Sequence, residues 1–266
     1  MFGTSKVFIG VVHLPPLPGS PRWSGDLDSV LEWARRDARS LAEGGVHGLI
    51  VENYGDVPYV PGSVGPHTVA AMAMATRAVQ EVVDLPVGIN MLRNDPVSAI
   101  AVAVATGCRF VRINVHHGVM AADEGVIEGK AHETLRYRSA LGADDQVKIF
   151  TDLLVKHATP LGTSDLSYLA RETVERSLAD LLIVSGDATG EEASLHDLEV
   201  VKGAVPEVPV LVGSGLNEGN APGYLAVGDG AIVGTSLKMG GHIHNPVDVS
   251  RVAALSQRFA EARNNP

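Results

Sequence analysis

Two short stretches near the end of the chain carry the clearest signal of its architecture: Val210-Leu211-Val212-Gly213-Ser214-Gly215 and Ile232-Val233-Gly234-Thr235-Ser236. Each is an apolar run that ends in glycine and hydroxyl side chains. Runs that are apolar without alternation are typical of parallel strands, because both faces of such strands are buried. Glycine directly after a strand lets an anion approach the backbone amides. These stretches therefore predict two adjacent parallel strands that end at an anion site.

The same kind of run recurs along the whole chain and alternates with segments of helical periodicity. Eight runs in 266 residues repeat at roughly 33 residues, as in a (β/α)8 barrel of about 250 residues. We predict a single α/β domain over residues 1–266, a (β/α)8 TIM barrel, with an open doubly wound sheet as the alternative. The predicted strands are Val7 to Val12, Gly48 to Val51, Val87 to Asn90, Phe110 to Val115, Val147 to Thr151, Leu181 to Ser185, Val210 to Val212 and Ala231 to Val233.

The fourth repeat is longer than the others. Residues 116–129, which follow its strand, are rich in glycine and charge. Segments of this composition are typical of surface loops. We predict a long loop here, over the face of the barrel where the strands end, followed by a helix from about Lys130 to Leu141.

Composition and charge restrict the partners. The chain has 21 lysines and arginines and 31 aspartates and glutamates, so its net charge is 21 − 31 = −10. This negative charge argues against a nucleic-acid binder and against binding to anionic membranes. No apolar run approaches the roughly 20 residues of a membrane span, and the apolar run near the N-terminus continues into prolines instead of a cleavage site. The single cysteine, Cys108, forms no internal disulfide. We expect a cytoplasmic protein without direct membrane insertion, and a homo-oligomer as is common for barrels.

Polar side chains collect where the predicted strands end, which is the active face of this fold. Opposed carboxylates and an amine at this face suit acid–base catalysis, so the predicted catalytic residues are Glu52, Asp152 and Lys156. A Schiff base at Lys156 is possible chemistry, but pairing with Asp152 or with a ligand phosphate is the simpler interpretation. The predicted substrate-binding residues are His13, Asn90, Asn114, His116 and Ser185. Asp187 belongs to the same polar set after the sixth strand.

The paired glycine turns predict how a phosphate is held. Backbone amides and hydroxyls are neutral donors, so the acidic net charge is no obstacle to such a site. The predicted phosphate-binding residues are Gly213, Ser214, Gly215, Gly234, Thr235 and Ser236.

A metal site is less well supported by the sequence. Histidines are frequent, yet no set of histidines and carboxylates has a specific ligand spacing. We therefore predict no metal ligands and no certain cofactor. A divalent metal held by His13 or His116 remains an alternative.

Many blocks of the chain resemble the BtpA family, which includes SgcQ-type proteins. These blocks are 10–20, 51–58, 88–95, 112–116, 127–131, 155–158, 183–186, 212–215 and 233–238. The resemblance implies a phosphate-binding TIM barrel, a role in photosystem I biogenesis for cyanobacterial members, and sugar metabolism for SgcQ-like members. Asp187, where many relatives have a small residue, and Ile149-Phe150-Thr151 before Asp152 depart from the family pattern, which leaves the substrate open.

These observations favour an enzyme, a hydrolase, isomerase or lyase, that acts on a phosphorylated sugar, nucleoside or related small metabolite. Glycosidic cleavage between two carboxylates, isomerisation and aldol chemistry all remain open. A non-catalytic factor for the biogenesis or stability of a membrane complex, as the family name suggests, is the first alternative. A metal-dependent hydrolase is the second.

Overall fold

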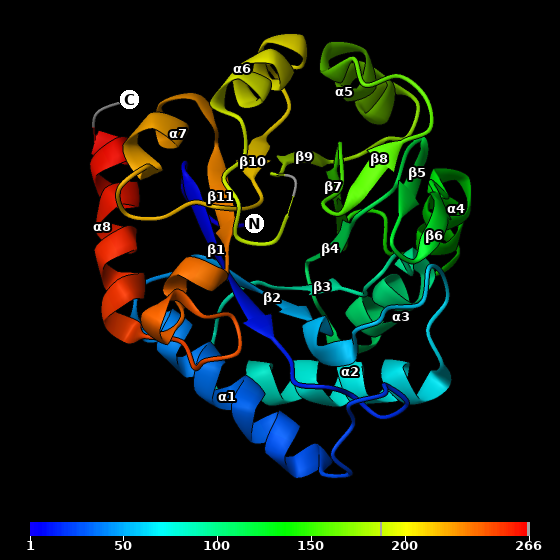
Figure 1. Cartoon of the computed structure of the whole chain (residues 1–266), viewed down its shortest axis with the longest axis vertical. Helices are drawn as coiled ribbons and strands as arrows, with labels where there is room; N and C mark the ends of the chain where they lie inside the picture. Colours follow the sequence, from blue (N-terminus) through cyan, green and yellow to red (C-terminus); the bar gives the residue numbers. More distant parts are fainter. Residues whose placement is uncertain (187, 265–266) are drawn as a thin grey trace.

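Eight parallel strands close into a barrel that helices surround on the outside, as the computed structural model shows for residues 1–186 and 188–264 (Figure 1). Asp187 and the last two residues lie outside the described part. Around the barrel the strand order is β1-β11-β10-β9-β7-β4-β3-β2. The barrel strands are β1 (Val7–His13), β2 (Gly48–Glu52), β3 (Val87–Asn90), β4 (Phe110–Ile113), β7 (Lys148–Asp152), β9 (Leu181–Val184), β10 (Val210–Val212) and β11 (Gly230–Val233).

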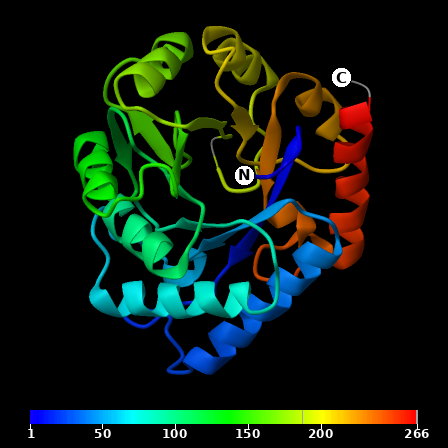
Figure 2. The ribbon, with the colours of Figure 1, turned by 180° about the vertical axis from the view of Figure 1, so that it is seen from behind.

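The helices follow the strands in regular alternation, so the predicted (β/α)8 barrel is confirmed and the open sheet is wrong. Figure 2 shows the same ring of helices from behind, where α1 and the C-terminal α8 lie next to each other. The helices are α1 (Leu27–Glu43), α2 (Pro66–Gln80), α3 (Pro96–Thr106), α4 (Ala131–Ala140), α5 (Leu166–Glu175), α6 (Leu195–Ala204), α7 (Ala221–Val227) and α8 (Val249–Asn264). Within the described residues, no helix combines the length and the apolar character needed to cross a membrane.

The segment 116–129, predicted as a loop, contains a β-hairpin. Strands β5 (Val119–Ala122) and β6 (Gly125–Glu128) pair antiparallel, and β8 (Ala158–Pro160), from the segment after β7, pairs with β5. Met120 and Ile127 are buried on one face of this small sheet, while Val126 is exposed. The hairpin lies on the same side of the molecule as α4 and α5 (Figure 1). The structure therefore replaces the expected irregular loop by a second, three-stranded sheet.

Alternation along the strands decides what fills the barrel. Ile9 and Val11 of β1, Ile50 of β2 and Phe150 of β7 point inward and pack together. Two residues further along the same strands come His13, Glu52 and Asp152 on the same inward face, because side chains of a strand alternate between its two faces. The lower interior is therefore apolar, and the layer at the C-terminal ends of the strands is polar.

Short 3-10 helices complete the ends of two strands. They are η1 (Tyr54–Asp56) after β2, and η2 (Thr235–Leu237) and η3 (Met239–Gly241) after β11. η1 and η2 come just after β2 and β11, and η3 follows η2, at the face that carries the polar layer. These turns, like the glycine turn after β10, border the site described below.

Candidate active site

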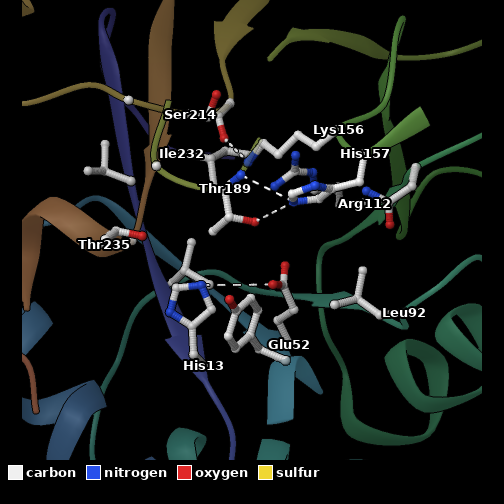
Figure 3. A pocket seen from close by; sticks show the side chains of 18 of the residues that line it. His13, Glu52, Leu92, Arg112, Lys156, His157, Thr189, Ser214, Ile232 and Thr235 are labelled. Carbon is white, nitrogen blue, oxygen red and sulfur yellow. Dashed lines mark hydrogen bonds and ion pairs between the residues drawn. The ribbon is translucent and has the colours of Figure 1, made fainter. Parts of the chain in front are cut away.

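A cavity of about 530 Å³ opens at the C-terminal ends of the barrel strands. Its wall includes residues from β1, β2, β4 and β11 and from the loops that follow most of the strands (Figure 3). Such a position is where the active sites of (β/α)8 barrels lie. Polar side chains that border it include His13, Glu52, Tyr54, Tyr59, Arg93, Arg112, Asn114, Asp123, Glu124, Lys156, His157, Thr189, Ser214, Asn217, Thr235, Ser236 and Arg251.

Glu52 is a buried carboxylic acid at the edge of this cavity. It is the last residue of β2, and its Oε1 lies 3.8 Å from Nε2 of His13 on the neighbouring β1 (Figure 3). Among the described residues, its carboxylate accepts no hydrogen bond. Burial raises the pKa of Glu52, because a charged carboxylate loses its hydration there. Glu52 can therefore hold or release a proton nearer neutral pH than an exposed glutamate.

His13 is held as a neutral imidazole. Burial, followed by the positive charges of Lys238, Lys156 and Arg112, lowers the pKa of His13 well below its ordinary value. Its Nδ1 has no hydrogen-bond partner within 1–186 and 188–264. The imidazole is thus available to a ligand as a neutral donor or acceptor.

Asp152 lies beneath the cavity instead of facing it. Its carboxylate accepts two hydrogen bonds from Arg112, Nε at 2.9 Å and Nη2 at 2.7 Å, one from Asn114 at 3.1 Å and one from Ser185 at 2.7 Å. The Asp152 side chain is fully buried and does not line the cavity. Since its oxygens are occupied by four donors, we correct the predicted role of Asp152 from catalytic acid or base to partner of Arg112.

Lys156 extends into the cavity from the loop after β7 (Figure 3). Its Nζ donates a hydrogen bond to the carbonyl oxygen of Gly213, at 3.1 Å. Burial, together with the positive charge of Arg112, lowers the pKa of Lys156 to about 8. A fraction of this amine is therefore neutral near physiological pH, which suits a proton carrier or a nucleophile.

Both glycine turns border the cavity, at the ends of β10 and β11. Gly215 has a φ of +71°, and a Cβ there would lie 2.3 Å from the Glu192 backbone. A Cβ on Gly234 would lie 2.4 Å from the His13 ring. Gly215 therefore requires glycine for steric reasons, and a larger residue at 234 would displace the His13 ring, whatever binds between the turns.

The hydroxyls of the two turns are not equivalent. Ser214 Oγ accepts a hydrogen bond from the Gly186 amide at 2.7 Å, and Ser236 Oγ donates to the Leu216 carbonyl at 2.7 Å. The Thr235 hydroxyl has no protein partner in the described part of the chain and lies at the cavity (Figure 3). Of the predicted hydroxyl donors, Thr235 is thus the one free to meet a ligand.

The predicted substrate-binding residues separate into two groups. His13 and Asn114 line the cavity, whereas Asn90 and Ser185 lie beneath it, Asn90 donating to Asn114 at 3.3 Å. His116 faces elsewhere: its Nε2 lies 2.8 Å from the Ser177 carbonyl oxygen, and it does not border the cavity. We therefore remove His116 from the proposed site.

The turn of the backbone after β4 explains the position of His116. Asn94 accepts a hydrogen bond from the Val115 amide and donates one to the Val115 carbonyl, both at 2.9 Å. This clamp redirects the chain before His116, so a histidine close to a strand end in sequence does not reach the strand-end face.

Arg93, Arg112 and Glu124 are site residues that sequence reasoning missed. Arg112 is buried in β4 between Phe110 and Asn114, at a spacing of two, so its inward direction was predictable from the inward Asn114. Arg93 lies three residues after β3, close enough to the strand end to suggest the same face. Glu124 reaches the cavity from the turn of the β5–β6 hairpin, and no local sequence pattern predicts that contact.

The donor set for a metal is incomplete in the part of the chain that is described. There, no three or more His, Cys, Asp or Glu side chains are grouped so that they could hold a metal ion. His13 and His116, the ligands considered from the sequence, do not share a site.

Comparison with known proteins places the chain in a family. The sequence profile of the BtpA family matches residues 4–261. The "Photosystem I biogenesis protein BtpA" of Synechocystis is 48% identical over 260 residues, which cover 98% of this chain and 90% of the relative. An uncharacterised mitochondrial protein of Caenorhabditis elegans is 39% identical over 251 residues, 92% of this chain and 89% of the relative.

A solved structure shares the fold at much lower sequence identity. Thiamine phosphate pyrophosphorylase from Pyrococcus furiosus superimposes with a TM-score of 0.57 at 14% identity, covering 97% of this chain and 96% of that one. That similarity concerns the barrel alone. Since the family profile spans nearly the whole chain and the cyanobacterial relative is close to half identical, this protein belongs to the BtpA family.

Proposed function

We propose that this protein is an enzyme that binds a phosphorylated sugar, nucleoside or related small metabolite and performs acid–base chemistry on it with Glu52. One observation carries the proposal. A buried carboxylic acid with a raised pKa faces a cavity of about 530 Å³ that is also bordered by three arginines and a lysine. Perturbed acids beside cations in a cleft are typical of active sites.

The phosphate end of the substrate is assigned to the turns Gly213–Gly215 and Gly234–Ser236. In the described residues, the amides of Ser214, Gly215, Thr235 and Ser236 have no protein acceptor, and the Thr235 hydroxyl is free. Amides at the ends of the last two barrel strands are the usual phosphate donors of this fold. The fold similarity to a thiamine phosphate pyrophosphorylase agrees with this assignment.

Glu52 serves at the reacting end. As a base, its carboxylate removes a proton from a carbon next to a carbonyl, and the electron pair of that C–H bond forms an enolate whose oxygen becomes negative. Arg112 and Lys156 are the cations that stabilise this oxyanion. Where the deprotonated carbon also carries a hydroxyl, as in a sugar phosphate, the hydroxyl proton moves to the former carbonyl oxygen and Glu52 returns its proton to the former carbonyl carbon. The new carbonyl then stands on the first carbon, which completes an isomerisation.

Hydrolysis between two carboxylates is less well supported by this geometry. It requires a second acid that faces the substrate and is free to act. Asp152 is occupied by Arg112, Asn114 and Ser185 below the cavity, and Glu124, the other buried acid, is paired with Arg93. An isomerase or a lyase therefore fits the site better.

The first test uses proton exchange. Metabolites released from the denatured protein are first identified by mass spectrometry. The exchange of their carbon-bound protons with deuterated water is then followed by NMR, once with the parent protein and once with Glu52→Gln. We expect Glu52→Gln to bind the ligand but to exchange it about 10²–10⁴-fold more slowly, the usual contribution of a general base. The exposed Glu128→Gln is the matched control. Equal exchange rates in the parent and Glu52→Gln contradict the proposal.

The second test addresses the phosphate turns. Thr235→Val keeps the shape of the side chain and removes its hydroxyl, so we expect about tenfold weaker binding of the phosphorylated ligand in calorimetry. Thr159→Val, on the exposed β8, is the control that changes the same group far from the cavity. Unchanged affinity in Thr235→Val removes Thr235 from the proposed phosphate site.

A role as an assembly factor is the second candidate, favoured by the name of the cyanobacterial relative. A relative in an animal, which has no photosystem, supports a function that is not restricted to photosynthesis. Complementation separates the two roles. In a strain that lacks this gene, Glu52→Gln is expected to restore the function fully if the protein is an assembly factor. If the protein is an enzyme, the variant is not expected to restore it.

A further inference from the structure

Arg93 borders the cavity and is paired with a carboxylate that comes from outside the barrel. It lies three residues after the end of β3, its side chain is 6% exposed, and its Nη2 donates to the carbonyl oxygen of Lys156. Its Nε lies 3.4 Å from Oε2 of Glu124, in the turn of the β5–β6 hairpin. The Glu124 side chain is 3% exposed and also borders the cavity. A carboxylate thus stands beside a buried guanidinium inside the proposed substrate space.

This pair is not a satisfied hydrogen-bonded ion pair. Both Nε of Arg93 and Oε2 of Glu124 are buried and make no hydrogen bond within the described residues. Arg112, in contrast, makes two hydrogen bonds of 2.9 and 2.7 Å to Asp152. A buried charged donor without a hydrogen bond is costly. Nε of Arg93 can therefore still donate a hydrogen bond to a better-placed carboxylate.

The charges around the cavity point the same way. Arg93, Arg112 and Lys156 border it, and Asp152 neutralises Arg112 from below. Glu52 holds its proton more readily than an exposed acid because it is buried. With a phosphate bound at the glycine turns, Arg93 still has Glu124 as its only acidic partner among the described residues.

We propose that Arg93 binds a carboxylate of the substrate at the place that the Glu124 carboxylate takes in this structure. The inference rests on the phosphate site of the proposed function and narrows the substrate class to phosphorylated carboxylic acids. Glu124 is then a competitor that the substrate displaces from Arg93. Planar guanidinium groups pair with carboxylates through two parallel hydrogen bonds, which the present pair lacks.

Calorimetry with matched ligands tests this inference. The pairs are 3-phosphoglycerate with glycerol 3-phosphate, 4-phosphoerythronate with erythritol 4-phosphate, and 6-phosphogluconate with glucitol 6-phosphate, each differing by a carboxylate against a hydroxymethyl group. We expect the carboxylate member of at least one pair to bind about tenfold more tightly or better, because charge-assisted hydrogen bonds are involved. Arg93→Gln should remove this preference and leave the affinity for the other member unchanged, which also shows that the variant is folded.

Glu124→Gln gives an independent reading because it leaves Arg93 in place. Removing the competing carboxylate should strengthen binding of the phosphorylated acid several-fold and leave the phosphorylated alcohol unaffected. Asp123→Asn, the neighbouring acid that also borders the cavity, is the matched control and should not reproduce this selectivity.

The outcomes separate the two proposals. If both members of every pair bind equally well to the parent, or if the preference persists in Arg93→Gln, the carboxylate site is overturned and the phosphate site stands. If inorganic phosphate and all members of the pairs fail to bind, the phosphate site itself is overturned. The carboxylate site at Arg93 is then overturned with it.

Discussion

Arg112 and Asp152 show how a residue's role depends on its partner. Asp152 ends β7 and Arg112 lies inside the neighbouring β4, so the two side chains meet in the polar layer beneath the cavity. An aspartate at the end of a barrel strand suggests catalysis when it is considered alone. Its four hydrogen bonds show instead that it orients the guanidinium that borders the site.

Replacing Asp152 should therefore affect stability first. Asp152→Asn leaves Arg112 as a buried charge without its counter-charge, and we expect a loss of about 3–5 kcal/mol in the free energy of unfolding, measured with urea. The double variant Asp152→Leu with Arg112→Met should recover much of that loss, because neither charge is then buried alone. A stable Asp152→Asn that has only lost activity would contradict this assignment.

The amine of Lys156 should titrate much earlier than an ordinary lysine. With a pKa of about 8, about one tenth of it is neutral at pH 7 and half at pH 8, and only the neutral form reacts with an acylating reagent. We expect its labelling rate to rise with a midpoint near pH 8, read by mass spectrometry against an N-acetyl-lysine amide standard, whose pKa is about 10.4. A labelling profile that follows the standard would refute this.

Among the elements, the turns after β11 are attached to helix α1 by a buried ion pair. Lys238, between η2 and η3, places its Nζ 2.5 Å from Oδ2 of Asp37 on α1, and both side chains are fully buried. Asp37 also accepts a hydrogen bond from the Val247 amide at 3.3 Å. This pair holds the segment that carries Thr235 against the helix layer.

Cutting this anchor should weaken both the fold and the phosphate turn. Lys238→Met leaves the buried Asp37 with only the half-exposed Arg36, at 3.3 Å, as a counter-charge. We therefore expect a loss of about 3 kcal/mol in unfolding free energy, the lower end for a broken buried pair, and weaker binding of phosphorylated ligand. Lys202→Met breaks the partly exposed pair with Asp229, at 2.7 Å, and should cost about 1 kcal/mol or less. Similar losses in the two variants, measured by urea unfolding, would contradict a special role for Lys238.

At the scale of the whole molecule, the barrel is a packed cylinder closed at its lower end by aromatic rings. Phe110 and Phe150 stack with ring centroids 4.5 Å apart, and Phe2 meets Phe110 edge-on at 5.9 Å. A Cβ on Gly88, in the adjacent β3, would lie 2.2 Å from the Phe110 ring. The glycine makes room for the aromatic layer on which the polar layer rests.

Filling that space should strain the barrel. For Gly88→Ala we expect a loss of about 1–3 kcal/mol, because the rings must shift in a closed interior. Gly203→Ala, in open space within α6, should instead gain about 0.5–1 kcal/mol, since alanine favours the helix. Thermal or urea unfolding of the two variants checks the opposite signs, and a stabilised Gly88→Ala would refute the tight layer.

The sequence by itself determined the barrel, the family and the polar face. Continuous apolar runs at a regular repeat allow few architectures, and glycines after the last two runs were correctly expected at one cavity. The same reasoning placed Glu52 and Lys156 there, because Glu52 lies at the end of a strand and Lys156 in the segment that follows one. It missed the hairpin β5–β6, whose strands are only four residues each and lie in a segment rich in glycine and charge.

Only the tertiary structure decided which charges are free to act. Arg112 and Asp152 are 40 residues apart in the chain, and Glu124 reaches Arg93 from a hairpin outside the barrel. These pairings depend on strand neighbours and on the path of a connecting segment, which local periodicity does not encode. Since the chemistry of a carboxylate depends on its hydration and its partners, burial and pairing distinguished the available Glu52 from the occupied Asp152.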